Sequence, residues 1–129
     1  MLSDGFREAA EAKDFTRLPE LAAEGVVFRS PVVFKPYEGR DAVAFVLSGA
    51  LQVFEDFRYV DQVETGNTAV LVFQARVGDR ALDGVDILRF DDEGQITELM
   101  VMVRPMSGIN ALAEAMQRKL AELEAAAAG

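Results

Sequence analysis

The sequence of 129 residues contains no cysteine and no histidine. Without thiols it can form neither disulfides nor zinc-thiolate sites, and it has no cysteine nucleophile. Without imidazole, a Ser-His-Asp triad, a histidine base and a histidine metal site are all excluded. Any proton transfer must therefore use carboxylates, tyrosines, lysines or water.

Basic residues are also scarce, because 13 Lys and Arg stand against 22 Asp and Glu, giving a formal net charge of −9. Such a charge repels phosphate backbones and anionic membrane surfaces, so neither nucleic acid nor a membrane is expected as a partner. No apolar run in the sequence approaches the ~20 residues of a membrane-spanning helix. The first residues lack the basic and apolar segments of a signal peptide, which favours a cytoplasmic location.

What is present is a globular composition, 50% hydrophobic and 27% charged. This length is typical of one domain, so we expect a single domain over 1–129 with a frayed tail at 125–129. No glycine-rich phosphate loop follows a predicted strand, and no cofactor is expected. No metal site is expected either, because the acidic turn at 91–94 lacks the spaced oxygen ligands of a calcium loop.

Helical periodicity marks the first half of the sequence and the end, and strand periodicity marks the rest. The apolar spacing predicts helices over 3–13, 15–23, 40–54 and 108–123. Short strands are expected over 26–29 and 32–35, followed by a turn at 36–39. Tight turns separate four further predicted strands, over 57–64, 69–77, 82–90 and 96–104. This order predicts an α+β fold in which an antiparallel meander follows the helices.

Two of the predicted strands are apolar on both faces. Along 96–104, for example, Leu99, Val101 and Val103 alternate with Met100, Met102 and Arg104. A sheet with one solvent-exposed face would instead alternate between apolar and polar residues. Because both faces are apolar here, we expect helices to cover one face and a second subunit to cover the other. The homodimer interface is expected to contain Val72, Gln74, Val85, Ile87, Arg89, Met100, Met102 and Arg104. The alternative is that the C-terminal helix folds back over the second face within one chain.

The run 82–96, LDGVDILRFDDEGQI, resembles a hairpin of nuclear transport factor 2-like proteins, the superfamily that includes ketosteroid isomerases and SnoaL-like polyketide cyclases. Ser30-Pro31 and the segment 37–43 match as well, and the order of elements agrees along nearly the whole chain. The resemblance implies a cystatin-like cone, in which a strongly curved sheet wraps a long helix and leaves an apolar pocket open at one end. It also implies dimers through the convex sheet face.

Ketosteroid isomerases supply a template for individual roles. By resemblance, their oxyanion-hole acid falls on Asp86, their general base on Ser30, and their oxyanion tyrosine at or near Phe6. A serine cannot remove a carbon-bound proton without a partner base, and phenylalanine donates no hydrogen bond. Ketosteroid isomerase activity is therefore not expected.

Asp86 is the candidate catalytic or ligand-binding residue. Among apolar neighbours its carboxyl would lose water, which favours the neutral acid, and a neutral acid can donate a hydrogen bond to a ligand carbonyl. A structural role, in which Asp86 pairs with a pocket tyrosine or arginine, is equally open. The expected pocket residues are Phe6, Ser30, Phe34, Phe45, Phe57, Tyr59, Phe73, Leu88, Leu99, Val101 and Val103.

Three functions stay open at this point. The nine Phe and two Tyr, with few polar groups beside them, favour a pocket protein that binds a small, largely apolar molecule without robust catalysis. The second is a cofactor-free isomerase, cyclase or dehydratase that acts on a ketone-bearing molecule with Asp86 as acid or base. The third is a dimeric protein-interaction module.

Overall fold

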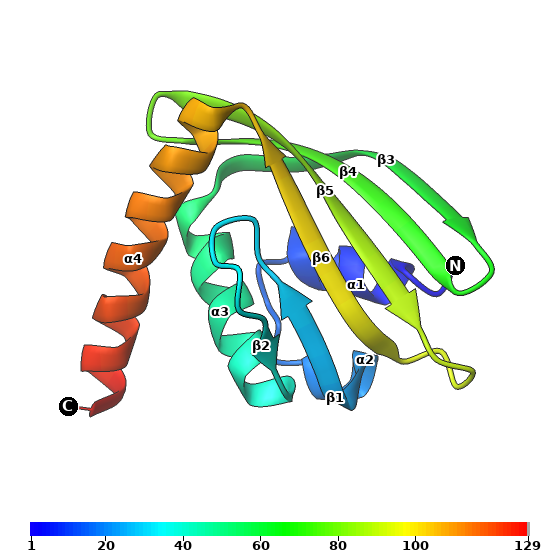
Figure 1. Cartoon of the computed structure of the whole chain (residues 1–129). Coiled ribbons are helices and arrows are strands. Elements are labelled where there is room, and N and C mark those ends of the chain that lie inside the picture. The colour runs from blue at the N-terminus through cyan, green and yellow to red at the C-terminus, as the bar shows by residue number, and fades with distance from the viewer. Residues whose placement is uncertain (129) are drawn as a thin grey trace.

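A strongly curved sheet of six strands is the main feature of the computed structural model, which describes residues 1–128 (Figure 1). The strand order is β2-β1-β6-β5-β4-β3. β1 and β6 are parallel, because a long connection through the third helix and the meander separates them, and the other neighbours are antiparallel. The α+β fold with a curved sheet around helices, expected from the sequence, is confirmed.

The meander agrees with the sequence pattern to within two residues at each end. Its strands are β3 (Glu55–Thr65), β4 (Thr68–Val77), β5 (Arg80–Phe90) and β6 (Ile96–Arg104). Gly66 and Gly78, in the turns of its first two hairpins, have φ of 55° and 60°, a region that glycine enters without strain. The helices are α1 (Asp4–Glu11), α2 (Leu18–Leu21), α3 (Arg40–Val53) and α4 (Met106–Ala128).

The segment before α3 differs from the expectation. The helix predicted over 15–23 is the single turn α2, because β1 (Ala22–Arg29) starts early and pairs with β6. Residues 32–35 form no strand. The Ser30 hydroxyl accepts hydrogen bonds from the backbone N–H groups of Val32 and Val33 and bends the chain there. The residues expected to turn instead include β2 (Tyr37–Glu38), which pairs with β1.

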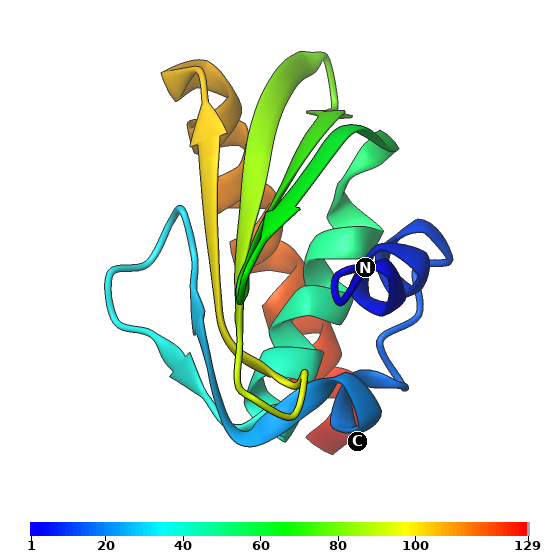
Figure 2. The ribbon, with the colours of Figure 1, turned by 90° about the vertical axis from the view of Figure 1, so that its right-hand side faces the viewer.

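The C-terminal helix α4 packs beside α3 on the concave side of the sheet (Figures 1 and 2). Its Leu112 is buried in the same core as Phe73 of β4. Near the start of α4, Gly108 lies so close to β5 that a Cβ there would be 3.0 Å from the Cβ of Leu82. The alternative that this helix covers the second sheet face is therefore wrong, and within residues 1–128 no helix covers the convex face.

The frayed tail expected at 125–129 is helical as far as Ala128, and residue 129 lies outside the described residues. Among the residues described, no helix combines the length and the apolar character needed to cross a membrane.

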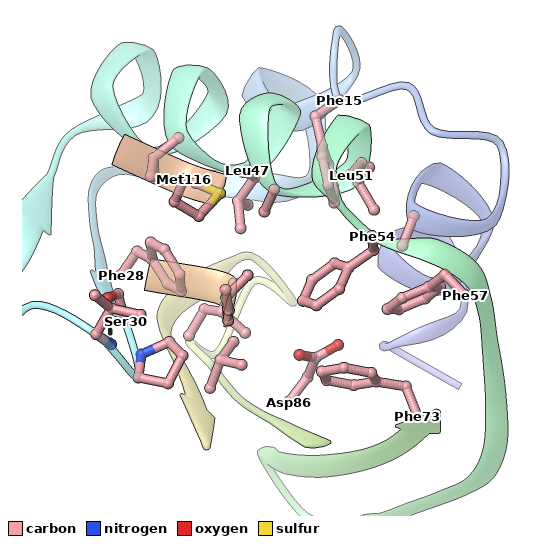
Figure 3. Close-up of a pocket in the computed structure, with 18 of the residues that line it drawn as sticks. Phe15, Phe28, Ser30, Leu47, Leu51, Phe54, Phe57, Phe73, Asp86 and Met116 are labelled. Carbon is pink, nitrogen blue, oxygen red and sulfur yellow. Dashed lines mark hydrogen bonds between the residues drawn. The ribbon is translucent and has the colours of Figure 1, made fainter. Parts of the chain in front are cut away.

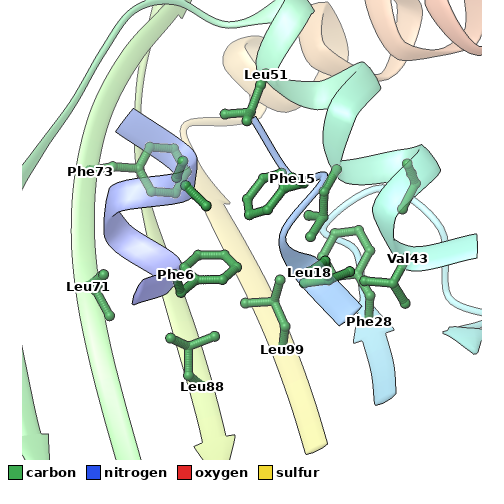
Figure 4. Close-up of a cluster of buried hydrophobic side chains, with 14 of the residues drawn as sticks. Phe6, Phe15, Leu18, Phe28, Val43, Leu51, Leu71, Phe73, Leu88 and Leu99 are labelled. Atoms are coloured by element: carbon green, nitrogen blue, oxygen red, sulfur yellow. The ribbon is translucent and has the colours of Figure 1, made fainter. Parts of the chain in front are cut away.

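The core fills the space between the concave face and the helices (Figure 4). Phe6 of α1 lies over Leu88 and Leu99 of neighbouring strands, and each of the three side chains is at most 3% exposed. Burying such a side chain contributes ~1.5–3 kcal/mol to folding. This packing holds α1 against the concave face, and Phe6 and Leu99 also border the space that remains open there.

Candidate functional site

An apolar cavity lies between the concave face of the sheet and helices α3 and α4 (Figure 3). The space open to the centre of a water molecule measures about 90 Å³. Aromatic and aliphatic side chains make up nearly all of its lining. The polar side chains in the described lining are Ser30, Asp86 and the hydroxyls of Tyr37 and Tyr59.

The structure brings most of the predicted pocket residues together at this cavity. The predicted residues that line it are Phe6, Ser30, Phe57, Tyr59, Phe73, Asp86, Leu99 and Val101. Sequence reasoning missed Phe54, which directly follows α3, and Leu112 and Met116 of α4. The apolar spacing predicts the helix over 108–123, but it carries no signal for where that helix lies against the sheet.

Four expected pocket residues lie elsewhere, which corrects their placement. Phe34 is fully exposed in the loop that follows the bend at Ser30. Phe45 is 37% exposed on the outer face of α3 and lines a separate shallow groove. Leu88 is completely buried in the core, and Val103 packs beside that core without lining the cavity.

Asp86 contributes the carboxyl group of the cavity. The alternation of β5 turns its side chain inward, opposite Leu71 of β4 and Val101 of β6, and it is 6% exposed. Its Oδ2 accepts a hydrogen bond from the Tyr59 hydroxyl at 2.7 Å. Within residues 1–128 no group donates a hydrogen bond to Oδ1. Every fully enclosed polar side-chain atom among these residues has a hydrogen-bond partner, so Oδ1 is not fully enclosed. Oδ1 is therefore accessible from the cavity, into which the carboxyl points (Figure 3).

The ionisation of this pair follows from its burial. Desolvation raises the pKa of Asp86 to about 7. The hydrogen bond from Tyr59 favours the ionised form and lowers this pKa, but by less than desolvation raises it. Burial and the neighbouring Asp86 charge raise the pKa of Tyr59 far above its ordinary value. Tyr59 therefore remains a hydrogen-bond donor, while Asp86 exists in both protonation states near neutral pH.

Tyr59 is held by aromatic contacts and by its strand. Tyr59 lies opposite Phe73 of β4, and the register of β3 shifts between Tyr59 and Asp61. Its ring meets that of Phe57 edge-on with centroids 5.0 Å apart, and the Arg7 guanidinium lies 5.5 Å from its centroid. The pairing of Asp86 with a pocket tyrosine, which the sequence left open, is thus present, and it leaves one carboxyl oxygen free.

The groups at the other two template positions, and the nearby Asp83, have their own contacts. The Ser30 hydroxyl oxygen accepts from two backbone N–H groups, and the ring of Phe6 packs against Phe15 with centroids 5.3 Å apart. Asp83 faces the opposite side of the sheet and accepts hydrogen bonds from Gln74 and Arg104. In the described part of the chain no three acidic side chains gather as a metal site would require.

The convex face carries all eight residues predicted for a dimer interface. Register places Val70, Ile87 and Met100 in one row across three strands, and Val72, Val85 and Met102 in the next. A polar row flanks them, in which Arg58 donates to Gln74, Gln74 to Asp83, and Arg104 to Asp83. On the other flank, Arg89 donates to Thr68. We call the first two rows the apolar band.

Comparison with known proteins identifies relatives of the whole fold. A family model for the SnoaL-like domain matches residues 4–99. A structure described as a steroid delta-isomerase from Pseudomonas aeruginosa is 45% identical, with a TM-score of 0.92 over 96% of this chain and 92% of that chain. No protein of curated function matches this sequence.

Two further structures are similar to this chain. An uncharacterised protein with a cystatin-like fold from Silicibacter pomeroyi is 35% identical, with a TM-score of 0.85 over 88% of this chain and 81% of that one. An NTF2-like protein of unknown function from Mesorhizobium loti is 24% identical, with a TM-score of 0.72 over 81% and 88% of the two chains. At that identity the likeness concerns the fold alone.

Proposed function

Because the chain belongs to the SnoaL-like domain family, we propose that its cavity binds a small, largely apolar molecule and holds one oxygen atom of that molecule at Asp86. The observation that carries the proposal is the accessible Oδ1 of a buried carboxyl in a wall that is otherwise mainly hydrocarbon. A ligand oxygen at this atom would form the hydrogen bond that no group within residues 1–128 makes with it, and such a bond contributes ~0.5–1.5 kcal/mol net.

The two carboxyl oxygens of Asp86 have different hydrogen-bond partners in this proposal. Oδ2 accepts from Tyr59, so the proton of the neutral acid can reside on Oδ1 and be donated to a ligand carbonyl. The two hydrogen bonds use different oxygens and do not compete. The remaining affinity comes from apolar surface, which contributes ~25 cal/mol per Å² removed from water. Asp86 is the one carboxyl in the described lining, so a bound molecule meets no separate acid and base.

The test compares two ligands of the same shape. Cyclohexanone and methylenecyclohexane differ in an oxygen against a CH₂ group, and each is titrated into isotope-labelled protein by NMR. We expect the ketone to bind at least ~5-fold more tightly, the scale of one net hydrogen bond. Asp86→Leu should abolish this preference, whereas Asp83→Leu, on the opposite sheet face, should preserve it. Absence of saturable shifts at the cavity with either compound would rule the proposal out.

A second candidate is a cofactor-free isomerase, favoured by the 45% identity to a structure described as a steroid delta-isomerase. Ser30 lines the cavity at the position where the resemblance implies a general base. We expect Ser30→Asp to convert cyclohex-3-enone to cyclohex-2-enone at least ~100-fold faster than the unaltered protein. The new carboxylate would take a proton from the carbon next to the carbonyl and return it to the far alkene carbon. Ultraviolet absorbance follows the conjugated product.

Ser107→Asp is the control for this experiment, because Ser107 is exposed at the start of α4, outside the cavity lining. Equal rates for the two variants would remove the isomerase candidate. Turnover by the unaltered protein would instead show that a group other than Ser30 acts as base.

We further propose that two copies of the chain associate through the apolar band. Its side chains are half-buried or exposed in one chain, Met102 at 49%, and polar rows flank it on both sides. Sedimentation should give twice the chain mass. Met102→Asp should weaken the dimer at least ~10-fold, because the interface would enclose an unpaired charge. Met106→Asp, at a 76% exposed position outside the band, should have no effect. A monomeric unaltered protein at micromolar concentration would contradict the proposal.

A further inference from the structure

The cavity has a closed end and an open end. Phe73, Tyr59 and Asp86 at one end are at most 8% exposed. The exposed part of the lining is in the loop after β1, where Val32 and Val33 are 39% and 43% exposed, and Met116 of α4 is partly exposed as well. Figure 3 shows Asp86 among the aromatic rings of the closed end, with Ser30 and Met116 toward the other. A ligand that reaches Asp86 must therefore enter with its oxygen first.

The space between these ends is small. It measures about 90 Å³, whereas a cavity of about 150 Å³ holds benzene and the sites of drug-sized ligands measure about 300–1,000 Å³. A modest turn of a flexible side chain would admit one six-membered ring. A fused four-ring molecule with its oxygen at Asp86 would have to displace the wall of side chains that borders the open end.

Met116 is the side chain at that wall best suited to set the limit. Leu112, one helical turn earlier, is 3% exposed and belongs to the core, so it holds α4 in place. Met116 packs against the core while remaining partly exposed, and its unbranched thioether adapts to different contents. It also lies beyond residues 4–99, the part of the chain that matches the family model.

Resting on the proposed function, we propose that the site takes single-ring or short-chain carbonyl compounds and that Met116 excludes larger ones. The acceptor oxygen lies at Asp86, and the apolar body fills the space as far as Met116. Steroid-sized ketones are excluded by volume, while the polar contact at Asp86 stays available to them.

The test measures binding of cyclohexanone and of androst-4-ene-3,17-dione, a four-ring ketone, by NMR titration of the whole chain. Met116→Ala removes three heavy atoms at the open end and should tighten steroid binding at least ~10-fold while changing cyclohexanone binding less than ~3-fold. Met116→Leu, of similar volume, should retain the selectivity of the unaltered protein. Met106→Ala, on the same helix and outside the cavity, is the matched control.

The outcomes separate this inference from the proposed function. If the steroid binds the unaltered protein and Met116→Ala equally well, the size limit is overturned while ligand binding at Asp86 stands. If neither ketone binds the unaltered protein or any variant, the proposed function itself fails, and the size limit fails with it. Selectivity that changes equally in Met106→Ala would also overturn the role of Met116.

Discussion

The two faces of the curved sheet are made by the same strands and differ in what covers them. On the concave face of β4, Leu71 and Phe73 are at most 1% exposed, while Val70 and Val72 on the convex face are only half-buried. The concave face holds one buried acid with a free oxygen, whereas the polar groups of the convex face bind one another. Alternation along a strand thus separates a surface suited to a ligand from one suited to another protein chain.

The largest expected difference between the faces is in stability. Phe73 and Val72 are neighbours on β4 with opposite orientations, and the ring of Phe73 contacts those of Phe54, Phe57 and Tyr59. Phe73→Ala should lower the free energy of unfolding by ~3–5 kcal/mol through the cavity it leaves. At protein concentrations where the chain is monomeric, Val72→Ala should lower it by about 1 kcal/mol or less. Urea denaturation measures both, and equal losses would contradict the contrast between a packed and an open face.

The second prediction uses the titration of the concave acid. Burial raises the pKa of Asp86 to about 7 from an ordinary value of 3.8, so between these two pH values the folded chain binds more protons than the unfolded chain. The stability that the neutral Asp86 carboxyl contributes is fully present below its pKa in the unfolded chain. It is lost as the pH rises through its pKa in the folded chain.

Relative to Asp86→Asn, which does not titrate, the unaltered protein should lose on the order of 2–3 kcal/mol of stability between pH 5 and pH 8. Denaturation curves of both proteins at the two pH values measure this difference. A difference that stays constant with pH would mean that Asp86 has an ordinary pKa. Asp83→Asn serves as a control, because Asp83 lies on the convex face beside Arg104.

Much of this contrast is visible in the sequence. The fixed two-residue period of a strand puts Asp86 on the face opposite to Val85 and Ile87, and the family resemblance implies that the Asp86 face is the concave one. The same local pattern could not place α4, because the positions of Leu112 and Met116 depend on how one helix packs against distant elements. The local pattern also does not predict the exposure of Phe34, which follows the bend where the Ser30 hydroxyl accepts two backbone hydrogen bonds.

The partner of Asp86 shows the same limit at the site itself. The sequence predicts Tyr59 in the pocket, but its hydrogen bond to Asp86 joins two strands that are separated by β4, and periodicity along one strand gives no signal for such a contact. By resemblance, the tyrosine of related isomerases falls at or near Phe6 on the first helix. Here a hydroxyl reaches the acid from a strand instead, and it binds the acid itself.

The smallest predicted effect concerns the close approach beneath the cavity. Gly84 pairs directly with Phe73, and a Cβ on Gly84 would lie 2.1 Å from the Cζ of that ring. Gly84→Ala should therefore displace the ring and destabilise the fold by ~1–3 kcal/mol, the cost of overpacking. Gly25→Ala is the matched control, because Gly25 also lies in a strand and has no atom within 4 Å of an added Cβ.

Removing one glycine's freedom in the unfolded chain stabilises the folded state by ~0.4–1 kcal/mol where the native backbone suits alanine, so the control should be neutral or slightly stabilising. The difference between the two variants then isolates the steric contact at Phe73. In cyclohexanone titrations, Gly84→Ala should also weaken binding, because the displaced ring stands beside Asp86 at the closed end of the cavity (Figure 3). Unchanged stability and unchanged binding in Gly84→Ala would mean that the Phe73 ring moves aside at no cost, which would contradict tight packing at the closed end of the cavity.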